Sequence, residues 1–286
     1  MYQCERLARG ERLAEFGENI IEIQGLSKVY ATRNQKKVVA FRDVSLDIKR
    51  HEFVSLLGPS GCGKTTVLNV IAGLIPSTTG SVKLEGKEVK QPMRDVGFVF
   101  QQPTLLQWRN VMDNVLFPIE MLHRNRRDYE KRALQLLELV GIEEFRSHFP
   151  YQLSGGMQQR AAICRALIHD PSILLMDEPF AALDALTREF MNNELQDLWM
   201  NERKTVILVS HSIPETVYLS DRVVIMSERP GTIVGIEKID MPRPRSADMR
   251  DSEEFTVHSR RLRSLLLQNS PSLSMGRRKN VSIVTD

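Results

Sequence analysis

The segment 58–66, Gly-Pro-Ser-Gly-Cys-Gly-Lys-Thr-Thr, constrains the fold more than any other part of this sequence. It follows the apolar run Phe53–Leu57, which predicts a buried strand, and it precedes a helical pattern. A complete Gly-x-x-x-x-Gly-Lys-Thr motif between a strand and a helix is typical of a phosphate-binding loop, because glycines let backbone N–H groups surround the anion. The segment predicts an α/β nucleotide-binding core. The residues expected to contact the nucleotide are Gly58, Pro59, Ser60, Gly61, Cys62, Gly63, Lys64, Thr65 and Thr66.

Two adjacent carboxylates, Asp177 and Glu178, follow the apolar run at residues 173–176. Ligands of parallel α/β proteins bind where the strands end, and successive strand residues point to opposite faces, so the two acids can serve different purposes. We expect Asp177 and the hydroxyl of Thr65 to hold Mg²⁺, and Glu178 to polarise the water that attacks the γ-phosphate. The alternative, a solvated acidic pair at a strand end, is less favoured beside a phosphate loop.

His211 directly follows the apolar run Thr205–Ser210, which predicts another strand. We expect its imidazole on the ligand side of the sheet, where it could contact the γ-phosphate and orient the water. A histidine in such a position is otherwise an ordinary loop residue. The remaining histidines have no comparable placement: His51, His123, His148, His169 and His258.

The turn Ser154-Gly155-Gly156 precedes a helical run, which places it at a helix N-terminus and makes it a second natural anion site. One chain has no evident need for two such sites. We therefore expect this turn to face the nucleotide held by a second copy of the chain across a two-fold axis. The alternative is a helix cap without a ligand.

The pattern of apolar residues divides the chain into three parts. Residues 1–19 form a polar extension, residues 20–245 form the α/β domain with a helical subdomain at about 102–165, and residues 246–286 form a C-terminal helix and a disordered tail. Short strands are expected at 38–41 and 44–48, and Gly141 is placed to end a helix. No internal repeat is evident.

Composition adds little to this interpretation. Lys plus Arg, 39, against Asp plus Glu, 36, gives a net charge of +3, which does not indicate a nucleic-acid partner. No run approaches the ~20 apolar residues of a membrane-spanning helix, so any transport must use the pore of a partner. The cysteines show neither disulfide nor metal-ligand spacing. Because Cys62 lies within the phosphate loop, we hypothesise that thiol reagents inhibit the protein and that ATP protects it.

Taken in order, these motifs resemble those of the ATP-binding-cassette (ABC) ATPases over roughly residues 20–241. The resemblance implies a P-loop NTPase core with a parallel sheet, an antiparallel β part and an inserted helical subdomain, which binds ATP and Mg²⁺ between two copies. It further implies that Gln101 contacts Mg²⁺ and takes part in catalysis, that residues 182–184, with Asp184, form a dimer-contact loop, and that Tyr30 stacks on adenine. An exposed strand-end tyrosine is the alternative for Tyr30.

Residues 105–115, 228–231 and 241–245 resemble the subgroup that energises uptake of nitrate, sulfonate, taurine, bicarbonate or pyrimidine precursors, although Gln107 stands where proline is common. This implies integral membrane permease subunits and a solute-binding protein as partners, and a peripheral location on the cytoplasmic side of the inner membrane. The segment from Trp108 to Pro118 is a candidate permease contact; alternatively, Trp108 packs within the helical subdomain. Two rival classes are an ABC protein acting in DNA repair or translation and an ATP-binding scaffold without hydrolysis.

Overall fold

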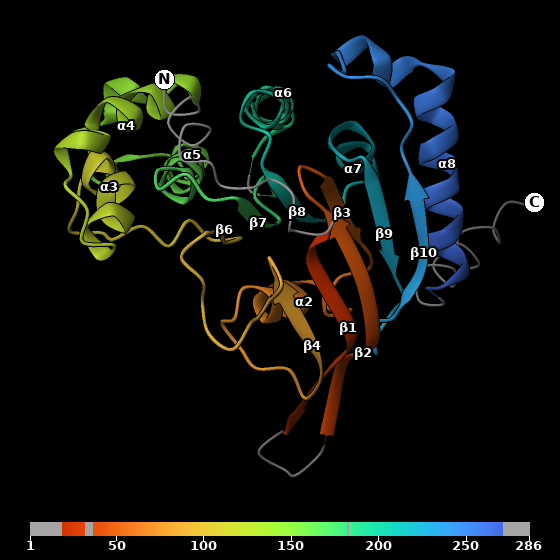
Figure 1. Cartoon of the computed structure of the whole chain (residues 1–286). Helices are drawn as coiled ribbons and strands as arrows, with labels where there is room; N and C mark the ends of the chain where they lie inside the picture. Colours follow the sequence, from red (N-terminus) through yellow and green to blue (C-terminus); the bar gives the residue numbers. More distant parts are fainter. Residues whose placement is uncertain (1–18, 32–36, 182, 271–286) are drawn as a thin grey trace, which may run out of the picture.

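The structure of the chain is a computed structural model and describes residues 19–31, 37–181 and 183–270. A central sheet has the strand order β10-β9-β3-β8-β7-β6, with β10 antiparallel to β9 and the other neighbours parallel (Figure 1). Its strands are β3 (Phe53–Leu57), β6 (Val96–Val99), β7 (Ile173–Asp177), β8 (Thr205–Ser210), β9 (Arg222–Met226) and β10 (Ile233–Lys238). The parallel core predicted from the phosphate loop is confirmed.

A second, antiparallel sheet has the order β2-β1-β4-β5. Its strands are β1 (Asn19–Ala31), β2 (Lys37–Lys49), β4 (Thr79–Leu84) and β5 (Lys87–Glu88). The two short strands predicted at 38–41 and 44–48 are instead one strand, β2, which pairs with β1 along its length. Between the two predicted strands, Asp43 has φ of +50° and lies at an irregularity in the pairing that does not end β2.

The helices are α2 (Lys64–Ile71), α3 (Val111–Met121), α4 (Arg127–Leu139), α5 (Gly155–Leu167), α6 (Ala185–Glu202), α7 (Ile213–Leu219) and α8 (Glu253–Gln268). Short 3-10 turns lie at Glu143–Phe145, Pro150–Gln152 and Ala247–Asp251. None of these helices combines the length and the apolar character that crossing a bilayer requires.

Helices α3, α4 and α5 gather at one end of the molecule, beyond the edge strand β6 (Figure 1). They lie between β6 and β7 in the chain, where the sequence predicts a helical subdomain. Gly141 follows α4 with φ of +66°, a backbone conformation suited to glycine, and its N–H donates to the Glu138 carbonyl oxygen. Helix α8 falls in the predicted C-terminal part, whereas the N-terminal extension 1–18 and the tail 271–286 lie outside the described residues.

The central sheet separates two hydrophobic cores. Phe53 and Leu57 of β3 pack on the side of α3–α8, whereas Val54 and Leu56 pack with α2 and the antiparallel sheet. Strands β7 and β8 alternate in the same way. Because each fully buried Leu or Val contributes about 1.5–3 kcal/mol, burial on both faces fixes the central strands, and with them the loops at their carboxyl ends.

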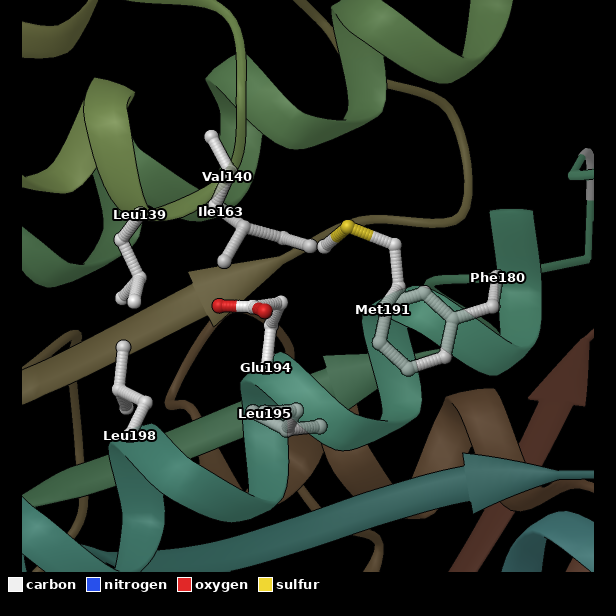
Figure 2. Close-up of a pocket in the computed structure, with 8 residues that line it drawn as sticks. All are labelled: Leu139, Val140, Ile163, Phe180, Met191, Glu194, Leu195 and Leu198. Carbon is white, nitrogen blue, oxygen red and sulfur yellow. The ribbon is translucent and has the colours of Figure 1, made fainter. Parts of the chain in front are cut away.

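A small apolar crevice lies between α6 and the helical subdomain, and Figure 2 shows the Glu194 carboxylate among the apolar side chains that line it. Its lining residues are Leu139, Val140, Ile163, Phe180, Met191, Glu194, Leu195 and Leu198. Burial raises the pKa of Glu194, and the nearby charge of Asp197 raises it further. Within the described part of the chain, the Glu194 side chain forms neither a hydrogen bond nor an ion pair.

Candidate active site

The predicted phosphate loop connects β3 to α2. Gly61 and Gly63 have φ of +75° and +106°, and a Cβ atom at Gly63 would lie 2.8 Å from the Ala40 carbonyl oxygen of β2. Glycine is therefore required at position 63 for both backbone conformation and space. A Cβ atom at Gly61 would meet no atom within 4 Å, so the loop is open on that side. Gly58 is packed against Cys62 and Met226, Pro59 and Ser60 lie in the loop, and Thr66 lies in the first turn of α2.

Lys64 holds a buried positive charge within this loop. Its side chain donates from Nζ to the carbonyl oxygens of Gly58, at 2.8 Å, and Pro59, at 2.9 Å, and the residue is only 4% exposed. Lys64 forms no ion pair with any described carboxylate. A buried ammonium group without a counter-charge is costly, so this arrangement favours an anionic ligand at the loop.

The cysteine of the loop is inaccessible. Cys62 is 1% exposed, and burial raises the pKa of its thiol, although the Lys64 charge opposes that change. Alkylation requires an accessible thiolate. The hypothesis of inhibition by thiol reagents, suggested by the position of Cys62 in the sequence, is therefore not supported by the structure.

Asp177, the last residue of β7, meets the first turn of α2. The Thr65 hydroxyl donates to Asp177 Oδ1 at 3.0 Å. Burial raises the pKa of Asp177, the Thr65 hydrogen bond and the Lys64 charge lower it, and the neighbouring Glu178 raises it. A hydroxyl and a single carboxylate beside a phosphate loop are hard oxygen donors of the kind that fits Mg²⁺, which retains water and phosphate oxygens as its other ligands. The described residues contain no cluster of three or more His, Cys, Asp or Glu side chains arranged to hold a metal.

Glu178 contacts side chains that follow the two strands on either side of β7. Its Oε2 atom accepts a hydrogen bond from Gln101 Nε2 at 3.3 Å and lies 3.3 Å from His211 Nδ1. Gln101 comes shortly after β6, Glu178 directly after β7 and His211 directly after β8, which are adjacent in the sheet. Glu178 has φ of +44° and its N–H donates to the Val209 carbonyl oxygen, so the backbone turns sharply at this residue. The structure thus brings together the three predicted catalytic residues.

The Ser-Gly-Gly turn is at the start of α5. The Ser154 side chain accepts from the Met157 N–H at 3.3 Å, and a Cβ atom at Gly155 would meet nothing within 4 Å. The helix N-terminus therefore faces an open surface. Among the described residues, no side-chain hydrogen bond or ion pair joins this turn to the phosphate loop of the same chain.

Asp184 begins the next helix, α6. Its Oδ1 atom accepts from the Thr187 N–H at 3.0 Å, and this bond together with that of the Thr187 hydroxyl lowers the pKa of Asp184. Leu183 lies close to the Ser-Gly-Gly turn, because a Cβ atom at Gly156 would be 3.0 Å from Leu183 Cδ2. The two predicted dimer contacts therefore adjoin one another. Ala182 lies outside the described residues.

Tyr30 lies near the end of β1 and is 41% exposed. It pairs with Val38 of β2, two residues before Ala40, whose carbonyl oxygen borders Gly63 of the phosphate loop. The Lys28 Nζ atom lies 5.2 Å from the centre of the Tyr30 ring. The ring is thus accessible and belongs to the strand pair beside the phosphate loop.

Three residues that the motifs did not single out adjoin the predicted catalytic group. Arg188, Ser210 and Glu215 line a small pocket together with Glu178 and His211. The remaining lining residues are Phe180, Ala181 and Ser212. Arg188 carries no signal in the sequence, and the only signal for Glu215 is its position in a helical turn four residues after His211.

The fold and the site define a phosphate-loop nucleotide-binding protein with an antiparallel β part and an inserted helical part. The family model of the ABC transporter matches residues 41–181. The chain is 48% identical to an uncharacterised ABC transporter ATP-binding protein of Methanocaldococcus jannaschii over 246 residues, which cover 86% of this chain and 91% of that protein. The chain therefore belongs to the ABC transporter ATP-binding family, and it is an ABC transporter ATPase.

Two further relatives are taurine import proteins. The taurine import ATP-binding protein TauB of Rhizobium johnstonii is 43% identical, with 84% of this chain and 97% of that protein covered. Its counterpart in Jannaschia sp. is 46% identical, with 74% and 80% covered.

Solved structures of the ATP-binding cassette MJ0796 share the fold. One, a dimer in a post-hydrolysis state bound to ADP and Pi, is 34% identical with a TM-score of 0.69. Another dimeric structure of the same cassette is 35% identical with a TM-score of 0.71, and each comparison covers 78% of this chain and 100% of the other. The cassette fold expected from the sequence is confirmed.

Proposed function

We propose that this chain hydrolyses ATP to energise import of a small anion or organic solute, of the taurine, sulfonate, nitrate or bicarbonate kind, through a partner permease. The convergence of Gln101, Glu178 and His211 beside the phosphate loop carries the proposal of hydrolysis. The taurine import proteins among the relatives support the solute class.

The phosphate loop and Lys64 bind the ATP phosphates. Backbone N–H groups of the phosphate loop, to which Pro59 cannot contribute because proline has none, surround the β-phosphate, and the Lys64 ammonium neutralises charge on the β- and γ-phosphates. Thr65 and Asp177 would hold Mg²⁺, with Gln101 as a further contact, and the bound ion would neutralise charge that develops on the phosphate oxygens. The Tyr30 ring stacks on the adenine.

Glu178 is the residue that activates water. Its carboxylate accepts a hydrogen bond from the attacking water and polarises it toward the γ-phosphate. The two side chains that lie 3.3 Å from its Oε2 atom hold the carboxylate in place: Gln101, which follows β6, and His211, which follows β8. The His211 imidazole, which is exposed, is available to contact the γ-phosphate.

A second copy completes the site. The N-terminus of α5, with Ser154, Gly155 and Gly156, faces outward and binds the γ-phosphate held by the other copy, while Asp184 lies at the contact between copies. The dimeric state of both MJ0796 structures supports this arrangement. ATP binding brings the two copies together and hydrolysis separates them, which drives the permease.

The permease contact is proposed to include Trp108. Its side chain is 74% exposed, which opposes the alternative that it packs within the helical subdomain. An exposed tryptophan next to Arg109, which pairs with Glu120, suits a short helix of an integral membrane partner. The complex places the chain peripherally on the cytoplasmic side of the inner membrane, with a solute-binding protein on the other side.

The replacement Glu178→Gln tests the proposed hydrolysis. The variant should bind ATP, accumulate as an ATP-bound dimer and lose turnover by about 100-fold or more, because an amide does not activate water. Gel filtration with ATP and a phosphate-release assay measure the two effects. Glu138→Gln, on the exposed side of α4, is the matched control and should turn over normally. A wild-type rate for Glu178→Gln would show that another group activates the water.

The solute is tested in membranes. The chain is purified with its membrane partner, the complex is reconstituted, and ATP-dependent uptake of taurine, another sulfonate, nitrate and bicarbonate is compared. Uptake of one of them that is abolished by Glu178→Gln supports the importer proposal. A complex that moves none of them, or an ATPase that associates with nucleic acid or ribosomes in place of a permease, contradicts it.

A further inference from the structure

Two loops emerge beside Glu178, and a small pocket lies between them. One loop follows β7 and leads through Leu183 to α6; the other follows β8 and carries His211 into α7. The pocket contains side chains from both loops and from both helices that follow. Its charged members are Glu178, Arg188, His211 and Glu215.

Glu215 fixes the loop that carries His211. The Ser210 hydroxyl donates to Glu215 Oε2, and the same hydroxyl oxygen accepts from the Ser212 N–H at 3.0 Å. Ser210 and Ser212 are the residues on either side of His211, so these two bonds close a clasp around it. The Glu215 N–H in turn donates to Ser212 Oγ at 3.4 Å, which joins the clasp to the first turn of α7.

Arg188 holds the loop after β7 through hydrogen bonds to two of its carbonyl oxygens. Its guanidinium donates from Nε to the Phe180 carbonyl oxygen at 3.2 Å and from Nη2 to that of Leu183 at 2.9 Å. The positive charge of Arg188 also lies close enough to the Glu215 carboxylate to oppose the effect of burial on its pKa. Burial raises the pKa of Glu215, which is 6% exposed, and the neighbouring Glu178 raises it further.

A buried carboxylate is costly to keep, and hydrophobic packing alone would not select it. Among the residues that the structure describes, the carboxylate accepts a side-chain hydrogen bond from Ser210 alone, and Ser210 is adjacent to His211, whose imidazole contacts Glu178. We propose that Glu215 is a positioning residue for hydrolysis, which holds His211 against Glu178 through the Ser210 hydroxyl. The inference rests on the proposed roles of Glu178 and His211.

A double-mutant cycle between Glu215 and His211 tests the proposal. Glu215→Gln preserves the shape of the side chain but weakens the clasp; it should lower kcat about tenfold and change KM for ATP by less than about twofold, since it displaces a group that acts after binding. In a His211→Ala background the same replacement should change the residual rate by less than about twofold, because there is no imidazole left to position.

Two further variants control for folding. Ser210→Ala breaks the clasp from the other side with little change in volume, and it should reproduce the loss in kcat with no added loss in the Ser210→Ala/Glu215→Gln double variant. Glu237→Gln removes a half-buried glutamate that contacts His258 and Arg261, far from this pocket in the sequence, and should leave kcat unchanged. Thermal unfolding of every variant is recorded alongside the kinetics.

The outcomes separate this inference from the function on which it rests. A wild-type kcat in Glu215→Gln, or an equal loss in both backgrounds, overturns the positioning role while the proposed role of His211 stands. A wild-type rate in His211→Ala overturns the proposed role of His211 and the inference together.

Discussion

Lys64 and Glu194 are charged side chains without an ion-pair partner among the described residues, and their surroundings differ in kind. Lys64 is held by two carbonyl oxygens of the phosphate loop, a kind of loop that binds anions. Glu194 projects among apolar side chains that offer it no hydrogen bond (Figure 2). A bound anion would offset the charge of Lys64, whereas the charge of Glu194 lowers the stability of the folded state.

The replacement Glu194→Gln should therefore raise the melting temperature at pH 8 by about 2 °C. Burial raises the pKa of Glu194 above the unfolded value of about 4.3, so the folded state binds the proton more tightly than the unfolded state. The Glu194 carboxyl group therefore contributes most to the stability of the folded state at a pH below its unfolded pKa. That contribution is lost as the pH rises through its folded pKa. The amide has no such dependence, so the difference in melting temperature should shrink as the pH is lowered toward 4.

Differential scanning calorimetry from pH 4 to pH 8 measures the effect. Glu138→Gln, whose side chain is exposed on α4, is the control and should follow the wild-type curve. A Glu194→Gln variant that is less stable than the wild type at pH 8 would show that this carboxylate has a stabilising partner.

The sequence predicts site residues that belong to motifs. It does not predict residues that reach the site only because distant segments come together in the fold. The adjacency of Asp177 and Glu178 at a strand end is enough to predict that they diverge, and they do contact different partners, Thr65 and Gln101. Arg188 and Glu215 approach Glu178 only because β7 and β8 are neighbours, which no spacing in the chain encodes. The burial of Cys62 likewise depends on contacts that are distant in sequence.

The C-terminal end of α7 is held by one buried side chain. Arg245, 2% exposed, donates from Nη1 to the carbonyl oxygens of Val217, Tyr218 and Ser220 at the end of this helix. Its Nη2 atom donates to carbonyl oxygens of the segment after β10. A helix leaves its last carbonyls without partners, and a cation is favourable there, so Arg245 caps α7 and ties the following segment to it. Burial lowers the pKa of Arg245 to about 10, which leaves it charged at neutral pH.

Replacement of Arg245 by Met should lower the free energy of unfolding by about 3 kcal/mol, because several buried carbonyls lose their donor. Arg245→Lys should recover only part of this, since an ammonium group cannot reach carbonyls of two segments at once. Urea unfolding measures both. The exposed Arg260→Met on α8 is the control, with an expected change within about 0.5 kcal/mol. A loss below 1 kcal/mol in Arg245→Met would contradict the capping role.

Elements with strong apolar patterns are predictable, and elements defined by their partners are not. Strands β3, β7, β8 and β9 are buried on both faces and appear in the sequence as continuous apolar runs. Strand β10 lies at an edge, has a glycine in its centre and is half-exposed, and β5 comprises two residues that pair only with β4. Neither has a pattern that distinguishes it from a loop.

For the whole molecule, the proposed shared site, in which the outward-facing N-terminus of α5 binds the nucleotide held by a second copy, predicts that hydrolysis needs two copies. Specific ATPase activity should therefore rise with protein concentration until the dimer saturates, since monomers lack half of each site. Phosphate release across a dilution series, with sedimentation in ATP at the same concentrations, tests this. Constant specific activity over a range in which only monomer sediments would contradict it.

The strand order also has a mechanical consequence. The groups gathered around Glu178 stand at the ends of β6, β7 and β8, and these strands continue into separate parts of the molecule: the helical subdomain, the loop leading to α6, and α7 (Figure 1). Because Gln101 and His211 both contact the Glu178 carboxylate, a displacement of that carboxylate would also displace the segments that carry these two residues. Loss of the γ-phosphate in the proposed reaction would therefore be transmitted to all three parts through the contacts at Glu178, without a separate chain of interactions across the protein.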